Sequence, residues 1–87
     1  IPNSEKIWPA DLVILAMGFK HPNLTVLNKL NITLDNRNNC LTKNYQTSVN
    51  KIFAAGDCRK GQSLVVWAIH EGREVAKSVD NFLKTIK

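Results

Sequence analysis

The sequence predicts an α/β fold in which two buried strands are combined with a small hairpin and one long helix. Two short apolar runs, residues 10–18 and 51–55, stop at Gly18 and Gly56. From Ser63 onward, apolar residues recur at spacings of three and four, which is typical of an amphipathic helix. Short apolar runs of this kind fit strands that are covered on both faces, as in a parallel sheet.

The first half of the chain is predicted to hold one strand, a turn and a hairpin. Residues 10–18 are rich in β-branched and other apolar residues, which suits the buried strand. Residues 20–23 contain a proline and read as a turn, and residues 24–30 permit a short helical turn. Residues 32–42 are predicted to form the hairpin, because the asparagine-rich stretch 36–39 tolerates the left-handed backbone that tight turns need.

The second half is predicted to hold the second strand and the helix. Residues 51–55 form the strand, and the Gly56-Asp57 pair ends it. The helix is expected to begin near Ser63 as its N-cap and to run for about six turns. A strand buried on both faces needs neighbours on either side, which 87 residues with one long helix do not supply. We therefore expect the sheet to be completed by sequence outside this chain.

Composition argues against several classes of function. The net charge of +5 comes from twelve scattered Lys and Arg residues, so no nucleic-acid-binding patch is expected. The longest apolar stretch, residues 12–17, is far shorter than the ~20 residues that span a bilayer, so no membrane association is expected. Cys40 and Cys58 lie 18 positions apart without a second pair or a histidine cluster. We expect no metal site and two reduced thiols in an intracellular protein.

The segment from Tyr45 to Asp57 carries the strongest indication of a binding site. It reads as a turn, a buried strand and a Gly-Asp pair at the carboxyl end of that strand, which is where ligands bind in open α/β sheets. Glycine lets a ligand approach the backbone, and the Asp57 carboxylate can accept hydrogen bonds from hydroxyl groups. The helix that starts near Ser63 directs its free N–H groups toward the same region.

Three stretches of the sequence resemble a known family. Thr47 to Asp57 resembles the second FAD fingerprint of flavoproteins with two dinucleotide-binding domains, and Ala10 to Gly18 resembles their other apolar marker. The stretch from Gly56 to Arg73 resembles the small subunit, or the fused C-terminal NAD(P)H- and FAD-binding domain, of glutamate synthase. The resemblance extends from Asp11 to Leu83, with modest departures at His70 and at the turn 36–39.

This resemblance implies a fold and a set of cofactor contacts. Residues 1–87 would be the C-terminal part of a doubly wound, Rossmann-like FAD-binding domain of the pyridine nucleotide-disulphide oxidoreductase type. Asp57 would hydrogen-bond the ribityl hydroxyls of FAD, and Gly56 would leave room for them. The backbone N–H groups of Leu64, Val65 and Val66 would face the pyrimidine edge of the flavin, with Leu64 near the nicotinamide. No catalytic side chain and no metal ligand is implied within these residues.

The resemblance also implies the reaction of the whole enzyme. It would oxidise NAD(P)H with FAD and pass electrons through iron–sulfur clusters to an FMN-bearing large subunit or domain, where glutamine and 2-oxoglutarate give glutamate. The cluster cysteines of such enzymes lie upstream of residues 1–87. An intracellular location is expected, in the cytoplasm or an organelle. The choice between NADH and NADPH, and between a separate subunit and a fusion, stays open.

Two alternatives remain at this stage. One is a related flavoprotein of the dihydropyrimidine dehydrogenase or ferredoxin–NADP reductase type, although residues 62–68 favour glutamate synthase. The other is a small basic binding module without enzymatic activity. Under the favoured interpretation, the 87-residue chain alone is expected to be inactive. No two of its four glycines have the spacing of the nucleotide-binding motif G-x-G-x-x-G, so both fingerprints would lie upstream.

Overall fold

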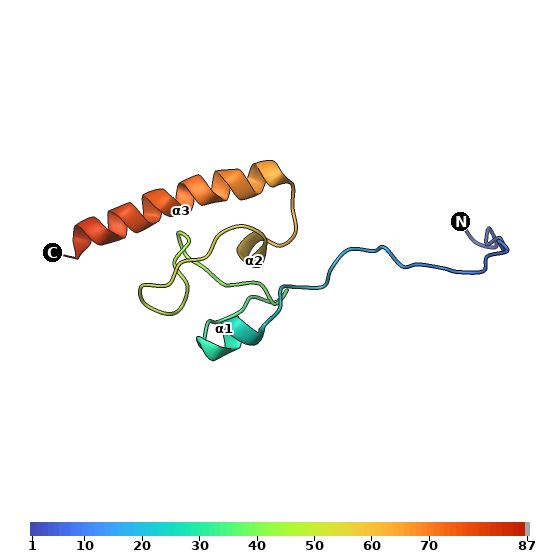
Figure 1. The fold of residues 1–87 in the computed structure, drawn as a ribbon, viewed down its shortest axis with the longest axis horizontal. Helices are drawn as coiled ribbons and strands as arrows, with labels where there is room; N and C mark the ends of the chain where they lie inside the picture. The colour runs from blue at the N-terminus through green and yellow to red at the C-terminus, as the bar shows by residue number, and fades with distance from the viewer. Residues whose placement is uncertain (87) are drawn as a thin grey trace.

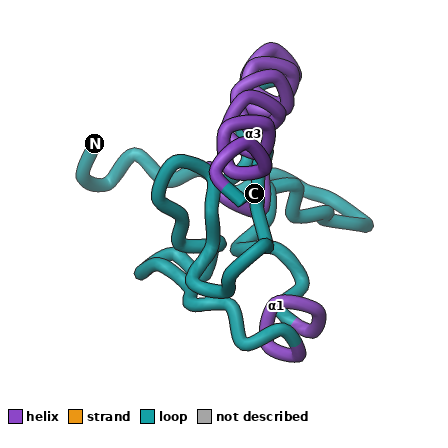
Figure 2. Tube along the Cα trace, turned by 90° about the vertical axis from the view of Figure 1, so that its left-hand side faces the viewer, coloured by secondary structure: helices purple, strands orange, loops and turns teal. Residues whose placement is uncertain are grey.

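The computed structural model describes residues 1–86 and contains three helices joined by long loops. Helix α1 spans Thr25–Lys29, α2 spans Asp57–Lys60 and α3 spans Val65–Thr85. Within residues 1–86 there is no strand, and Figure 2 accordingly shows only helix and loop. Three isolated antiparallel bridges link the loops: Leu34 with Cys40, Lys43 with Gln46, and Gln46 with Phe53.

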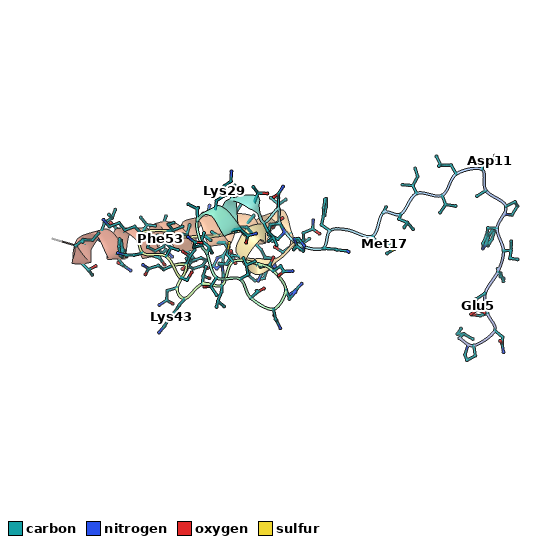
Figure 3. All side chains as sticks on the ribbon, turned by 90° about the horizontal axis from the view of Figure 1, so that it is seen from below. Glu5, Asp11, Met17, Lys29, Lys43 and Phe53 are labelled. Carbon is teal, nitrogen blue, oxygen red and sulfur yellow. The ribbon has the colours of Figure 1, made fainter. Side chains whose placement is uncertain are left out.

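The molecule is an elongated body with an extended N-terminal arm. Its principal extents are 67 × 28 × 26 Å and its radius of gyration is 18.9 Å. A compact chain of this length has a radius of gyration of about 12 Å. In Figure 3, Asp11 and Met17 lie on the arm, well away from the body that contains Phe53. The only apolar residues buried within the described part are Ile32 and Cys40, so these residues do not enclose a core of ordinary size.

The expected first buried strand does not form within residues 1–86. Residues 10–18 are irregular and exposed, and Met17 keeps 84% of its surface accessible. In Figure 1 this stretch runs through the arm with no segment beside it. A strand requires a partner for its N–H and C=O groups, and residues 1–86 provide none along this stretch.

The expected hairpin and second strand are reduced to single bridges. Over residues 32–42 the Leu34–Cys40 bridge stands alone, and over residues 51–55 the Phe53–Gln46 bridge stands alone. The Asp35 side chain closes the turn between the first pair, because its Oδ1 accepts hydrogen bonds from the backbone N–H groups of Arg37 and Asn39 at 2.8 and 3.0 Å. Side-chain hydrogen bonding of this kind competes with a regular ladder.

The long amphipathic helix is confirmed, with a corrected start. Helix α3 has 21 residues, which is close to the expected six turns. Its N-cap is Leu64 rather than Ser63, and no side chain caps it; the Leu64 carbonyl accepts the hydrogen bonds of the Trp67 and Ala68 N–H groups at 3.0 and 3.4 Å. The half-buried or buried positions of the helix repeat at spacings of three and four, and they are Glu71, Glu74, Val75, Ser78, Val79 and Phe82.

Helix α3 packs across the loop body mainly through its second half. The rings of Phe53 and Phe82 meet edge to face with centroids 5.5 Å apart, a favourable geometry for aromatic pairs. In Figures 1 and 2 the helix lies along one side of the loops that carry these contacts. The apolar residues of its first turn remain exposed, and Val65 keeps 74% of its surface accessible. None of the helices within residues 1–86 has the length and apolar character needed to cross a bilayer.

Candidate functional site

The Gly56-Asp57 turn has a backbone conformation that only glycine adopts readily. Gly56 has φ of +80° and ψ of −152°, and it serves as the N-cap of α2. Its carbonyl accepts hydrogen bonds from the N–H groups of Arg59 and Lys60 at 3.1 and 2.9 Å. These bonds start α2 at Asp57, so the position of the Asp57 side chain depends directly on how Gly56 is held.

Asp57 lines an open cavity of about 300 Å³. One wall comes from the α2–α3 region and the other from the end of the N-terminal arm, and the lining residues are Asp57, Gly61, Gln62, Arg37, Asn39 and Phe19 to Pro22. Gly18 approaches this region as well, since a Cβ atom on it would lie 3.6 Å from the Gln62 side-chain oxygen. The structure thus brings the end of the predicted first marker, residues 10–18, close to the Gly-Asp pair.

The backbone N–H groups of Leu64, Val65 and Val66 are free to meet a ligand. Among residues 1–86 no acceptor bonds to them, as expected for the first turn of a helix. All three residues are exposed. The start of α3 is held against α2 by Lys60, whose Nζ lies 4.4 Å from the centre of the Trp67 ring.

The carboxylate of Glu71 is buried and connects α3 to the Gly56-Asp57 turn. Only 2% of the surface of Glu71 is accessible. Its Oε2 accepts hydrogen bonds from the Gly56 N–H at 2.6 Å and from Arg59 Nε at 3.1 Å. Its Oε1 accepts a third bond from Arg59 Nη2 at 2.8 Å. The two-pronged contact between guanidinium and carboxylate is the strongest common geometry for such a pair.

Arg59 is itself anchored on the loop that precedes the site. Its guanidinium lies 4.6 Å from the centre of the Tyr45 ring, and its Nη1 donates a hydrogen bond to Thr42 Oγ1 at 3.4 Å. Lysine could not replace Arg59 here, because its ammonium group neither stacks on a ring nor forms two parallel hydrogen bonds with a carboxylate. Arg59 therefore joins the loop 42–45, the short helix α2 and the long helix α3.

The charges of this pair keep Glu71 ionised despite its burial. Desolvation by burial would by itself raise the pKa of Glu71, but hydrogen bonds from Arg59 and Gly56 and the charges of Arg59 and Lys60 outweigh it. The net result is a pKa below the ordinary value of 4.5. The same hydrogen bonds raise the pKa of Arg59 above its ordinary value.

The sequence analysis did not single out Glu71 or Arg59. The available signal was the position of Glu71 four residues before Val75 and eleven before Phe82, on the same helical face. A carboxylate on the inner face of a helix requires buried partners, but the spacing alone does not identify them.

Thr47, at the start of the second predicted marker, has a clear local role. It is buried, and its Oγ1 donates toward the carbonyls of Val49 and Ile52 at 3.2 and 3.0 Å. It also accepts a bond from the Val49 N–H at 3.2 Å. These bonds close the turn in which Lys51 has a left-handed φ of +67°, just before the residues that lead to Gly56.

The two cysteines are both free thiols, and they lie beside each other in the loop body. The Cys40 N–H donates to the carbonyl of Cys58 at 2.7 Å. Burial, followed by the nearby Cys58 thiol, raises the pKa of Cys40 to about 11. Within residues 1–86 no group of three or more His, Cys, Asp or Glu side chains is placed to hold a metal ion.

Comparison with known families gives a match over most of the chain. Residues 1–72 match the family described as pyridine nucleotide-disulphide oxidoreductase. The chain belongs to this family. The predicted family resemblance is thereby confirmed, and the matched region spans both predicted marker stretches, 10–18 and 47–57.

The relatives of this pyridine nucleotide-disulphide oxidoreductase chain include glutamate synthases. It is 46% identical over 84 residues to the glutamate synthase [NADPH] small chain of Bacillus subtilis, covering 95% of this chain and 17% of the relative. It is 55% identical over 82 residues to the glutamate synthase [NADH] of Schizosaccharomyces pombe, with coverages of 92% and 4%. For the glutamate synthase [NADPH] small chain of Escherichia coli the identity is 42% over 89 residues, with coverages of 97% and 19%. The chain thus spans less than a fifth of the length of these curated relatives.

Proposed function

We propose that this chain is part of the NAD(P)H-oxidising flavoprotein of a glutamate synthase, and that residues 56–66 contribute to its FAD site. The observation that carries the proposal is the Gly56-Asp57 turn and the free N–H groups of residues 64–66, found together in a chain 42% to 55% identical to glutamate synthases. A carboxylate and a set of unpaired N–H groups suit, respectively, the hydroxyls and the electron-rich edge of a flavin nucleotide.

Within that enzyme, residues 1–87 would be the C-terminal part of a doubly wound FAD-binding domain. The exposed apolar run 12–17 supports this, because large apolar side chains in series are normally covered in a folded domain. The glycine fingerprints for the nucleotide pyrophosphates would come from sequence outside these residues. Residues 10–18 would then become a paired strand, with neighbours contributed by that sequence.

The residues of this chain would hold and orient the cofactor. The Asp57 carboxylate would accept hydrogen bonds from the ribityl hydroxyls, and Gly56 would leave room, since a Cβ atom there meets no atom within 4 Å. The N–H groups of Leu64, Val65 and Val66 would stabilise negative charge on the pyrimidine edge, with Leu64 near the nicotinamide. When bound, FAD supplies the hydride chemistry with NAD(P)H.

The remainder of the enzyme would complete the electron path. Iron–sulfur clusters held by other residues would pass electrons to an FMN-bearing large subunit or domain. There, 2-oxoglutarate and ammonia derived from glutamine would give glutamate. This chain contributes no catalytic side chain to the scheme.

The experiment is a flavin assay on the full-length protein. We expect a yellow protein whose visible flavin band bleaches when NADH or NADPH is added without oxygen. Asp57→Ala removes a charge-assisted hydrogen bond worth about 1.5–3 kcal/mol, so FAD binding is expected to weaken by about 10- to 150-fold.

Asp80→Ala is the matched control for this change. Asp80 is another acidic residue, but it is exposed on α3 and pairs only with Lys84, at 2.6 Å. It should therefore leave flavin content unchanged. A colourless protein would contradict the proposed function, and equal flavin content in the two variants would remove Asp57 from the site.

A further inference from the structure

Glu71 makes more contacts with the Gly56-Asp57 turn than a simple ion pair requires. Both of its oxygens are used, and one of them receives the Gly56 N–H at 2.6 Å in addition to Arg59. Among residues 1–86, no other acceptor bonds to that N–H. The peptide between Ala55 and Gly56, one residue before Asp57, is therefore held by a side chain that lies 15 residues further along the chain, on α3.

The pair also acts on positions that lie before and after Asp57 in the sequence. Glu71 holds the residue before Asp57, whereas Arg59 sits two residues after it on the same short helix. The Tyr45 ring and Thr42 also contact the Arg59 guanidinium, and these contacts do not involve the carboxylate. If the carboxylate is lost, Asp57 becomes the nearest acidic residue in sequence to an uncompensated Arg59.

We propose that Glu71 and Arg59 are positioning residues of the flavin site, with the Glu71 carboxylate holding the Gly56 N–H so that the Asp57 side chain faces its ligand. This inference rests on the proposed function, because it takes FAD as the ligand of Asp57. Buried ion pairs contribute little to stability compared with apolar residues of similar volume. A buried carboxylate with three donors is thus better explained by the geometry it imposes on the turn.

The test compares three variants of the full-length flavoprotein. Glu71→Gln removes the charge and presents an amide N–H₂ to Arg59. The double variant Arg59→Met/Glu71→Met removes both charges and fills the space with apolar side chains, so that neither charge is left buried and unpaired. Glu74→Gln is the matched control, because Glu74 lies on the same helix but pairs only with Lys77 at the surface, at 2.6 Å.

The readouts are the dissociation constant of FAD, from fluorescence quenching on the flavin-free protein, and the thermal midpoint of that protein. We expect FAD binding to weaken by about tenfold or more in Glu71→Gln and in the double variant, since one charge-assisted hydrogen bond is misaligned. The double variant leaves the Gly56 N–H without its acceptor, so its thermal midpoint should fall by a few degrees while the protein stays folded at the assay temperature. Glu74→Gln should match the wild type in both measurements.

If Glu71 and Arg59 served only to stabilise the fold, their replacement would leave FAD binding by the folded protein unchanged. If the folded double variant binds FAD as the wild type does, the positioning role is overturned, whatever its midpoint. The same conclusion follows if Glu71→Gln binds FAD like Glu74→Gln. A wild-type protein that binds no FAD would instead overturn the proposed function, and this inference with it.

Discussion

Replacing Gly56 by alanine tests whether glycine is needed at this position for its backbone conformation or for the space that a missing side chain leaves. Gly56 has φ of +80° and ψ of −152°, a region that is essentially restricted to glycine. A Cβ atom there meets nothing within 4 Å, so within this chain the penalty comes from the backbone alone. Holding alanine in such a conformation costs about 1–3 kcal/mol. The lower entropy of the unfolded alanine chain offsets part of this, which leaves a net loss of about 1–2 kcal/mol.

Gly72→Ala is the matched control, because Gly72 lies inside α3, where a Cβ atom also meets nothing within 4 Å. There alanine should stabilise the protein by about 0.5–1 kcal/mol, since glycine is a poor helix former. The assay is the temperature at which the full-length protein releases FAD, followed by flavin fluorescence. We expect a fall of about 2–8 °C for Gly56→Ala and no fall for Gly72→Ala. Equal release temperatures for Gly56→Ala and the wild type would refute the claim that the turn requires a left-handed residue.

Three further predictions follow from the same region. Val65→Pro should leave α3 intact, because proline is tolerated at the first helical position and Leu64 before it is already extended. It should nevertheless weaken FAD binding more than Val65→Ala does, because proline lacks the backbone N–H. Equal effects of the two substitutions would exclude a backbone contact. Iodoacetamide at pH 7 should label Cys58 before Cys40, because a pKa of about 11 leaves roughly one Cys40 in 10⁴ as thiolate and only 2% of the Cys40 surface is accessible to the reagent. Peptide mapping that finds Cys40 labelled first would contradict this. The lowered pKa of Glu71 means that its stabilising contribution is present above about pH 4.5 and is lost as pH falls through the folded-state value. Flavin release on acidification should thus be steeper in the wild type than in Glu71→Gln, and equal slopes would argue against it.

The helix and the Gly-Asp turn were predictable because their signals are local. The apolar spacing from Leu64 to Phe82 depends only on helix geometry, and α3 follows it closely. The Gly56-Asp57 pair could be recognised as a strand-to-turn boundary because glycine permits positive φ. The N-cap was displaced by one residue because α3 begins with the carbonyl of Leu64, without help from the Ser63 side chain.

The strands and the buried ion pair were not predictable in the same way, because they depend on partners. Residues 10–18 have the composition of a buried strand, but pairing is a property of two segments, and residues 1–86 offer no second one. Glu71 reads as an ordinary helical surface residue until Arg59 and the Gly56 N–H are brought beside it from 12 and 15 positions away. Contacts across such intervals are outside what a periodic pattern can indicate.

The two parts of the site, the Gly56-Asp57 turn and the N-terminal arm, therefore depend on their surroundings to very different degrees. The Gly56-Asp57 turn is held by polar contacts within the chain, chiefly those of Glu71 and Arg59. Residues 10–19 of the arm expose six large apolar side chains, namely Leu12, Val13, Ile14, Leu15, Met17 and Phe19. Each is worth about 1.5–3 kcal/mol when buried, so together they correspond to roughly 9–18 kcal/mol, which is comparable with the whole stability of a domain. Because so much apolar surface is exposed on the arm, its structure depends on the sequence that covers it. The geometry of the turn that presents Asp57, by contrast, is set by residues 42–71 themselves. Hydrogen exchange in the full-length protein compared with this chain should thus change greatly along residues 10–19 and little at Gly56, and comparable changes at both would contradict this division.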